Sequence, residues 1–574
     1  MYNITLNAKA IRRLDLACLL LAFGLAGYFL TFLHIGWLSN GGTGSDLPYN
    51  LLAWCFTSLT CAAFWIVRPS TSKMVITPLL SLLLIGAVLM SLPLMWSPSS
   101  AAFYNALPRI GGLWAGMVFF LTIRQAPFTK NHKLLLLYSL TGAGAIEAII
   151  VLVELYGPTD WLPVIWQKLI DKYGRGGVGV FQQVNVTSSF LAVSLASSLF
   201  LFAFKDKSTE TVRFEKFRLL SLAVIAILVS SVLTLVYSRV GWLGGICSIA
   251  GIYIMLTFSQ YKNESRYQIF ILLLPAIGII VGYNLMHFSV GQALAAHAGS
   301  NKQRILTLYH TVIYANKYPV LGYGAGTYEG GYQSFMAKLL DGNLSRELMS
   351  HPHNELLYQY AEGGVIALAG VLIWCCLYIR LWLRAKNVTQ IAALLAMLPL
   401  ILHTQVEYPL YYSVPHWVML LILIRLADDE KKIKFEQSNK RHYALVGKFV
   451  LVLLSLYGAV ISFQANENAK VLSKFESNEL PTGASIAGLR VSWIQHLRYE
   501  EDKNLARLID FQQTHDTESL LFFVKENERI ISVHPCPELY SNQIAVLNYL
   551  HEYKKAKQWL MRARYTLPWM TEFQ

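Results

Sequence analysis

Two histidines, His351 and His353, stand in the segment MSHPHNELLYQYAEGG at the approach to a long apolar run. Pro352 disfavours a helix that continues through His351, and Asn354 is a good helix N-cap, so we expect His353 just outside a helix start. An imidazole there could act as the base that a serine or threonine hydroxyl needs to become a nucleophile. The alternative is a pair of surface histidines or an opportunistic metal pair, although residues i and i+2 do not share a helical face.

Three arginines stand in segments between apolar runs. Arg175 lies in the glycine-rich YGRGGVGVFQQVNVTSSF, Arg239 in the short turn VYSRVGWLGG, and Arg304 in SNKQRILTLYH. A guanidinium offers a fixed fork of donors that matches phosphate oxygens and stays charged at physiological pH. Together the three predict a bound anion, such as a pyrophosphate carried by a lipid. The alternative for each is that it reaches lipid headgroups or caps the C-terminal end of a helix.

Two further polar segments could shape such a site. The segment KYPVLGYGAGTYEGG, which contains Tyr323, holds closely spaced glycines that permit tight turns and expose backbone N–H groups to phosphate or sugar. It matches neither a Walker loop nor a Rossmann fingerprint. The segment HTQVEYPLYYSVPHW places Glu407 beside tyrosines and prolines, for which an interfacial aromatic belt and carbohydrate contact are the two interpretations.

Acidic residues are scarce in the segments that join the apolar runs, and no DxD motif occurs there. A glycosyl transfer that depends on a carboxylate-bound divalent cation therefore lacks ligands, and we predict no metal and no cofactor. Glu147 and Glu362 lie inside apolar runs, where they could serve a proton-coupled carrier, the main non-enzyme alternative. Hydrogen bonding to neighbouring helices is the favoured interpretation of both.

The elements that must position these residues are membrane helices. Hydrophobic residues make up 55% of the 574 residues and charged residues 14%, against about 25% in an average soluble domain. Apolar runs long enough to cross a bilayer recur, which excludes an ordinary soluble enzyme and predicts an all-α polytopic membrane protein with about thirteen transmembrane helices. The predicted spans lie near 14–33, 50–67, 75–95, 109–123, 134–155, 184–204, 219–236, 240–258, 267–286, 355–379, 388–404, 414–427 and 443–463.

The patterns of charge and of cysteine limit which topologies and which partners are expected. The net charge of +14 could indicate nucleic acid, but no basic cluster with interleaved aromatics occurs on a soluble stretch, so we predict no nucleic acid partner. Lysine and arginine gather in alternate loops, which predicts a cytoplasmic N-terminus and an outer loop at about 287–353. Six of the seven cysteines lie in apolar runs without CxxC spacing or histidine partners, so neither a disulfide framework nor a zinc site is expected.

The last part of the chain, 464–574, is predicted to be a helical domain on the outer side, following a membrane domain of 1–463. Its final segment, YSNQIAVLNYLHEYKKAKQWLMRARYTLP, repeats small and aromatic residues at a spacing of three to four and ends in Pro568, like half a tetratricopeptide unit. The alternatives are a helical platform for a protein partner and a packed helical cap.

Five motifs, in this order and spacing, resemble the bacterial O-antigen ligase superfamily over roughly residues 105–425. They are Arg175 with FQQVN, SRVGWL, QRI with KYPVLGYGAGTYE, HPHNELLYQYAEGG, and HTQVEYPL. The segment Gln183-Val184-Asn185, the element that begins at Glu407 and the long tail most resemble the protein O-oligosaccharyltransferases, including pilin glycosylases. The sequence departs from many members by Val184 in place of proline and by the second histidine, His351.

The resemblance implies transfer of a glycan from undecaprenyl pyrophosphate, at the periplasmic face of the bacterial inner membrane, to a Ser or Thr of a periplasmic or pilin protein. It maps the catalytic histidine to His353 and the donor-binding arginines to Arg175 and Arg239, with Arg304 as a third. An inverting, metal-independent reaction is expected, with membrane lipid as the surrounding partner. The residues expected to shape the site are Gln183, Asn185, Tyr323, His351, Asn354 and Glu407.

Three alternatives to protein glycosylation stay open from the sequence. A lipopolysaccharide O-antigen ligase or an O-antigen polymerase would share the donor and use a sugar hydroxyl as acceptor. A lipid-linked sugar flippase would form no bond and would depend on Glu147 or Glu362 more than on His353. A structural or assembly protein would tolerate the loss of His353.

Overall fold

The computed structural model describes residues 8–37, 44–70, 72, 74–204, 212–258, 267–286, 298–339, 343–345, 347–428, 441–477, 479–480 and 483–574. These residues form helices and no strand, which confirms the all-α polytopic membrane fold. The basic segments at 205–211, 259–266 and 429–440, and the start of the predicted outer loop at 287–297, lie outside the described residues. The longer helices are α1 (Ala8–Leu30), α2 (Pro48–Val67), α3 (Pro78–Ser91), α4 (Ser100–Arg124), α5 (Lys130–Tyr156), α6 (Val164–Tyr173), α7 (Val184–Ala203), α8 (Val212–Leu235), α9 (Arg239–Phe258), α10 (Gln268–Leu285), α12 (Ala298–Ala315), α13 (Tyr328–Met336), α14 (Glu355–Arg384), α15 (Val388–His403), α17 (Val414–Ala427), α18 (Arg441–Glu476), α20 (His496–Thr514), α21 (Thr517–Ile531), α22 (Pro537–Tyr549) and α23 (Tyr553–Thr566). Two single-turn helices, α16 (Pro409–Tyr412) and α19 (Ala484–Ala487), and short 3₁₀ turns complete them.

All thirteen predicted spans are helical in the described part of the chain. Eleven of these helices are long and apolar enough to cross a membrane. The other two, α15 and α17, have 16 and 14 residues. Because a helix rises about 1.5 Å per residue, neither reaches across a hydrocarbon core of about 30 Å. The cytoplasmic placement of the N-terminus stays a prediction.

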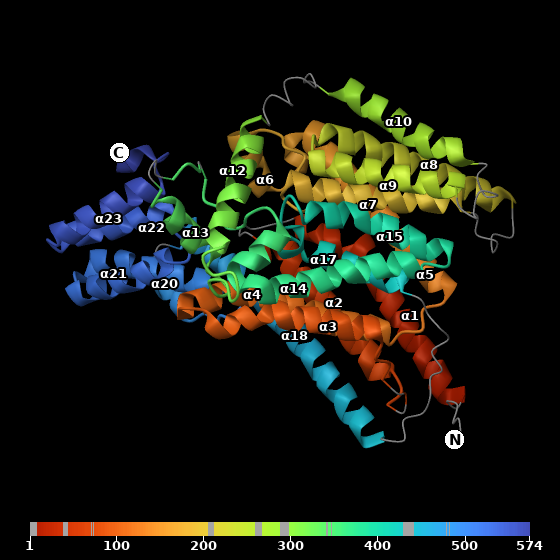
Figure 1. Ribbon diagram of the computed structural model, residues 1–574, viewed down its shortest axis with the longest axis horizontal. Helices are drawn as coiled ribbons and strands as arrows, with labels where there is room; N and C mark the ends of the chain where they lie inside the picture. Colours follow the sequence, from red (N-terminus) through yellow and green to blue (C-terminus); the bar gives the residue numbers. More distant parts are fainter. Residues whose placement is uncertain are drawn as a thin grey trace. The chain divides into compact units, whose positions relative to one another are not determined.

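The chain divides into two compact units, and α7 forms the centre of the first. Helices α5, α8, α9 and α15 pack around α7, whose apolar window is entirely buried. Small residues allow this close approach: a Cβ added at Gly144 would lie 2.1 Å from the Oγ of Ser194. Helices α8, α9 and α10 lie side by side in this unit (Figure 1). The first unit comprises Met1–Ser81, Ala115–Ala293 and Cys376–Gln464.

The second unit contains a helix, α14, that is broken near its start. Gly364 has φ +57° and ψ −154°, so the helical hydrogen bonds of the preceding turn are lost. The glycine-rich loop replaces them: the N–H groups of Tyr323 and Gly324 donate to the carbonyls of Ala361 and Glu362 at 3.1 and 2.9 Å. A broken helix is tolerated at membrane depth where other protein groups bond its freed backbone. The second unit comprises Leu82–Trp114, Leu294–Cys375 and Ala465–Gln574.

The tail belongs to this second unit and is helical, as predicted. Helix α20 packs on α21, and α22 packs on α23, as two hairpins (Figure 1). Val533 packs against Ala101 and Ala102 of α4, and the carbonyl of Thr566 accepts a hydrogen bond from Asn343 at 2.7 Å. The predicted domain boundary after residue 463 falls inside the continuous helix α18. That division into domains stays a prediction.

Candidate functional site

The predicted site residues fall in both units, and in the second unit His353 lies just before the capped start of α14. The Oδ1 atom of Asn354 accepts the N–H of Leu357 at 3.0 Å, which confirms the expected N-cap. His353 has φ +56°, in the left-handed region that residues with a Cβ rarely adopt. Such strain persists only where the surrounding structure imposes it, and it gathers at functional sites. The turn therefore fixes the backbone from which this imidazole projects.

The side chain of His351 is buried and supports this turn. Its Nδ1 accepts the backbone N–H of His353 at 3.0 Å, and its Nε2 lies 3.7 Å from a carboxylate oxygen of Glu355. Its ring packs against Tyr358, with 4.3 Å between the ring centroids. Burial lowers the pKa of His351, although Glu355 opposes this effect. A neutral ring with its proton on Nε2 satisfies these contacts, which suits His351 to positioning His353.

A buried ion pair that the sequence analysis missed lies in the same unit. Arg109 of α4 donates to Glu362 of α14, and its guanidinium lies 4.5 Å above the ring of Tyr358. The other carboxylate oxygen of Glu362 accepts the N–H of Tyr328 at 3.1 Å. Glu362 therefore joins three segments, as the hydrogen-bonding interpretation expected. An arginine directly after Pro108, within an apolar helix, was the signal that could have revealed its partner.

Three N–H groups of the glycine-rich loop, which the sequence suggested for phosphate or sugar, bond to other backbone groups. The N–H groups of Tyr323, Gly324 and Ala325 donate to the carbonyls of Ala361, Glu362 and Pro93. Positive φ values at Gly322, Gly324 and Gly326 make that path possible. The ring of Tyr323 stacks on Tyr314 at 4.1 Å, inside a cluster of tyrosines. The loop is thus a structural brace for the broken helix α14.

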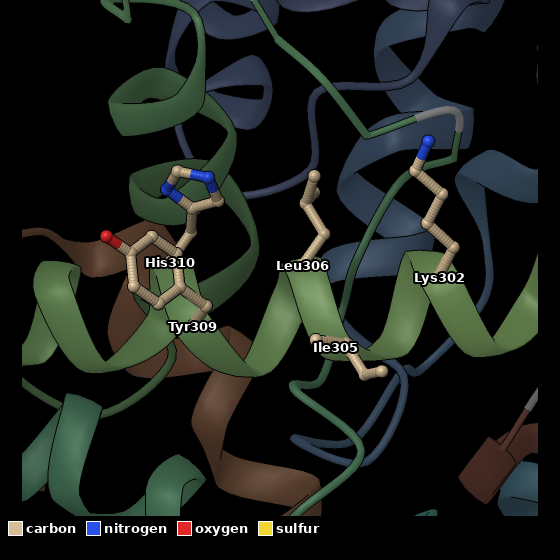
Figure 2. A pocket seen from close by; sticks show the side chains of 5 residues that line it. All are labelled: Lys302, Ile305, Leu306, Tyr309 and His310. Atoms are coloured by element: carbon tan, nitrogen blue, oxygen red, sulfur yellow. The ribbon is translucent and has the colours of Figure 1, made fainter.

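Arg304 lies half-buried on α12, in the second unit, whereas Arg175 and Arg239 belong to the first. A shallow hollow of about 470 Å³ lies along the same helix (Figure 2). Its lining is mostly apolar, and the side chains of Ile305 and Tyr309 are largely exposed. The residues that line it are Lys302, Ile305, Leu306, Tyr309 and His310.

In the first unit, Arg175 caps the C-terminal end of α5. Its Nη1 donates to the carbonyls of Glu154 and Gly157, both at 2.8 Å, and its Nη2 donates to the Oγ1 of Thr159 at 2.9 Å. This is the capping role that the sequence analysis kept as the alternative. The side chain is exposed, and three of its five N–H donors are used in these bonds.

Two buried carboxylates of α5 hold the loop that follows Arg175. Glu154 accepts the N–H groups of Val178 and Gly179 at 3.1 and 3.0 Å, and Glu147 accepts the N–H of Val180 at 2.9 Å. Because the two glutamates are seven residues apart, they share one face of the helix. Glu147 was predicted to bond within the protein; Glu154 was not predicted, and its spacing of seven residues from Glu147 is the signal that reveals it.

Asn185 connects three segments that carry predicted site residues. Its amide donates to a carboxylate oxygen of Glu407 at 3.2 Å, and its Oδ1 accepts the hydroxyl of Ser238 at 2.8 Å. Ser238 precedes α9, of which Arg239 is the first residue. The structure therefore brings Asn185, Glu407 and the turn of Arg239 together. A helix N-terminus carries positive character, so this turn favours an anion.

A buried hydrogen-bond chain, also missed, holds the segment that carries Glu407. The Oγ of Ser189 lies 2.8 Å from Nδ1 of His403 and 3.2 Å from Nε2 of His416. Nδ1 of His416 lies 2.7 Å from the Oγ of Ser413. Both histidines stand in the segment HTQVEYPLYYSVPHW. This segment therefore has buried hydrogen bonds in addition to the aromatic side chains that suggested an interfacial belt.

Strained backbone marks the candidate site residues in both units. Gln182 directly precedes Gln183, the N-cap residue of α7, and Tyr237 lies two residues before Arg239. With His353 itself, three strained positions stand at or beside predicted site residues. In the described part of the chain, the non-glycine residues with positive φ are Gln182, Tyr237, His353, His515 and His551.

Two protein-family models match parts of the chain. The family model described as O-Antigen ligase matches residues 224–372, and the model described as Virulence factor membrane-bound polymerase, C-terminal, matches residues 391–574. The two matches support the O-antigen ligase superfamily. With the membrane helices, they support a glycosyl-transfer function in a membrane. Searches of curated proteins and of solved structures each gave no match.

The superfamily matches cover most of the candidate site residues. The O-antigen ligase match contains Arg239, Arg304 and His353, and the second match contains Glu407 together with the tail. Arg175 and the segment of Gln183 and Asn185 precede both matches.

The Arg109–Glu362 pair allows a direct test of what holds α4 and α14 together in the second unit. Arg109→Met would leave the carboxylate of Glu362 buried without its cation, which should lower the stability by about 3–5 kcal/mol. The double variant Arg109→Met/Glu362→Gln removes both charges, so it should lose clearly less. Thermal unfolding in detergent measures both. An equal loss in the single and double variants would show that the two charges are not coupled.

Proposed function

We propose that this protein carries out O-linked protein glycosylation, by moving an oligosaccharide en bloc from undecaprenyl pyrophosphate to a Ser or Thr of periplasmic or pilin proteins. The observation that carries the proposal is the strained placement of His353 at the capped start of α14, inside the segment that matches the O-antigen ligase family. The long helical tail favours a protein as the acceptor. The site faces the periplasm of a bacterial inner membrane in this proposal.

The proposed reaction is a single displacement at the anomeric carbon of the first sugar. His353 takes the proton of the acceptor hydroxyl, and the hydroxyl oxygen forms the new bond to that carbon. The bond from the carbon to the pyrophosphate oxygen breaks, and the lipid pyrophosphate leaves. Arg175 and Arg239, with Arg304 as a third, neutralise its charge, since fixed cations stabilise a charge that develops in the transition state.

Several contacts support these assignments to different degrees. Arg239 begins α9 beside the Asn185–Glu407 contact, so it has the strongest support as a pyrophosphate ligand. Arg175 also caps α5, and this cap uses three N–H groups of its guanidinium. Its part in donor binding therefore relies on the two other N–H groups. His351 and Asn354 position the base, while Gln183, Asn185 and Glu407 shape the donor side. Tyr323 contributes indirectly, because its N–H bonds to α14 where that helix is broken.

A second candidate is an O-antigen ligase or an O-antigen polymerase. The two matching family models favour it, since one describes a ligase and the other a membrane-bound polymerase. The base and the donor would be the same, and the acceptor would be a sugar hydroxyl. A flippase has less support, because Glu147 and Glu362 are already hydrogen-bonded within the protein.

The deciding experiment identifies the acceptor by mass. The chain is expressed with a pathway that makes a lipid-linked glycan and with a periplasmic pilin-like protein. An added mass equal to the intact glycan on that protein would support protein glycosylation. Glycan on the lipid A core, or longer glycan on its carrier, would assign a ligase or a polymerase instead.

The configuration of the new bond provides a separate prediction. One displacement with one base inverts the anomeric carbon, so the product should have the configuration opposite to that of the donor. NMR of the purified donor and of the glycopeptide measures both. A retained configuration would require a covalent intermediate and would contradict the single-base mechanism. No divalent ion is expected at the reacting groups.

A further inference from the structure

Three potential metal ligands meet in the tail, away from the residues assigned to glycosyl transfer. They are Glu501 of α20 and His534 and Cys536 of the turn between α21 and α22. One ligand atom of each lies within 4.8 Å of the others, and each residue is partly buried. Ligand atoms this close to one another could converge on a single ion.

A fourth residue orients the histidine in the way that metal sites require. Nδ1 of His534 lies 2.9 Å from a carboxylate oxygen of Glu329, on α13. A carboxylate that accepts the Nδ1 proton of a histidine fixes its tautomer and leaves Nε2 to bind a metal. This pairing of a carboxylate with a metal-binding histidine is a common feature of zinc sites.

The backbone of the turn also favours a metal over a chance cluster. The N–H of Cys536 donates to the carbonyl of His534 at 3.0 Å, so the two ligands are held by a short, bonded turn. Cys536 is the N-cap residue of α22, and Pro535 and Pro537 flank it. The positive end of a helix favours a negatively charged ligand such as a thiolate. Cys536 forms no disulfide.

We infer that Glu501, His534 and Cys536 bind a zinc ion, oriented by Glu329, which departs from the sequence expectation of no zinc site because Glu501 and Glu329 are far from Cys536 in the chain. One sulfur, one nitrogen and one oxygen ligand suit Zn²⁺ in a tetrahedral site, with water as the fourth ligand. The ion would tie α20, the turn before α22 and α13 to one another within the second unit. It stabilises the tail and takes no part in the transfer reaction. The inference does not rest on the proposed function.

The test measures metal on the full chain purified in detergent. After incubation with Zn²⁺ and removal of free metal, we expect about one zinc per chain, as the three-ligand site implies. Co²⁺ in place of Zn²⁺ should give the absorption band of a cobalt thiolate. Cys536→Ser, His534→Ala and Glu501→Gln should each lose most of the metal. Zinc should also raise the unfolding temperature of the wild type and not of these variants.

Two further variants keep the result interpretable if a ligand variant fails to fold. Glu329→Gln keeps all three ligands and should weaken zinc binding by about 10- to 100-fold, the usual cost of losing such a carboxylate partner. Cys247→Ser removes a thiol of the first unit and should keep both the metal and the cobalt band. No zinc on the folded wild type, or equal zinc on every variant, would overturn the inference. Because the readouts are metal content and stability, its failure is distinct from failure of the glycosylation proposal.

Discussion

His353→Ala is expected to abolish glycan transfer at matched membrane levels, with a loss of about 10²- to 10⁴-fold for the chemical step. The structure places this imidazole in a strained turn whose N-cap and neighbouring His351 are both bonded to the backbone. Alanine at position 353 removes the imidazole but keeps the Cβ, so it leaves the backbone strain in place together with the bonds of His351 and Asn354 to the backbone. The protein should stay folded while losing transfer, and intact mass of the acceptor measures the loss.

The matched control for this variant is His132→Gln. His132 caps the start of α5 with its ring, and glutamine can form the same capping box. Transfer by this control should equal that of the wild type. His351→Gln should fall between the two, because the turn loses its support while the base remains. Transfer that survives His353→Ala would keep the enzyme and discard His353 as its base.

Arg239→Ala is expected to lower transfer by about 10²- to 10³-fold, the usual effect of removing one group that stabilises a developing anion. Arg239 begins α9, so its charge adds to the positive end of a helix at a turn held by Asn185. Arg239→Lys should recover only part of this loss, because a single ammonium cannot reproduce the fork. The measurement is the transfer rate at increasing concentrations of purified donor.

Arg213→Ala is the control for the loss of a surface cation, since Arg213 is exposed on α8. It should leave transfer unchanged. Arg175→Lys is expected to lower the unfolding temperature as well as transfer, because Arg175 closes the end of α5. The proposal for Arg239 fails if Arg239→Ala transfers at the wild-type rate. It also fails if the whole loss follows from unfolding.

Several parts of the site could be predicted because they depend on neighbouring residues. Asn354 caps α14 because a side-chain oxygen three residues before an N–H reaches it in any helix start. The thirteen spans are helical because an apolar run in a bilayer must bond its own backbone. The capping alternative for Arg175 was also available from the sequence, because a nearby arginine can bond the last carbonyls of a helix, and Arg175 bonds those of α5.

Other parts could not be predicted because they join residues far apart in the chain. The glycine spacing of the loop at Tyr323 is the same whether its N–H groups face a ligand or a helix. Only the break at Gly364 creates the carbonyls that accept them. Arg109 and Glu362 are 253 positions apart, so neither residue type nor spacing could pair them.

By itself, the sequence determined the all-α membrane class, the helical segments and the start of α14, because hydropathy and helix capping act over a few turns of one segment. Only the tertiary structure decided that Asn185 joins Glu407 to the turn of Arg239, and that Glu329 faces His534. Those contacts depend on which helices pack together. A buried polar group accepts whichever partner that packing brings within hydrogen-bonding distance.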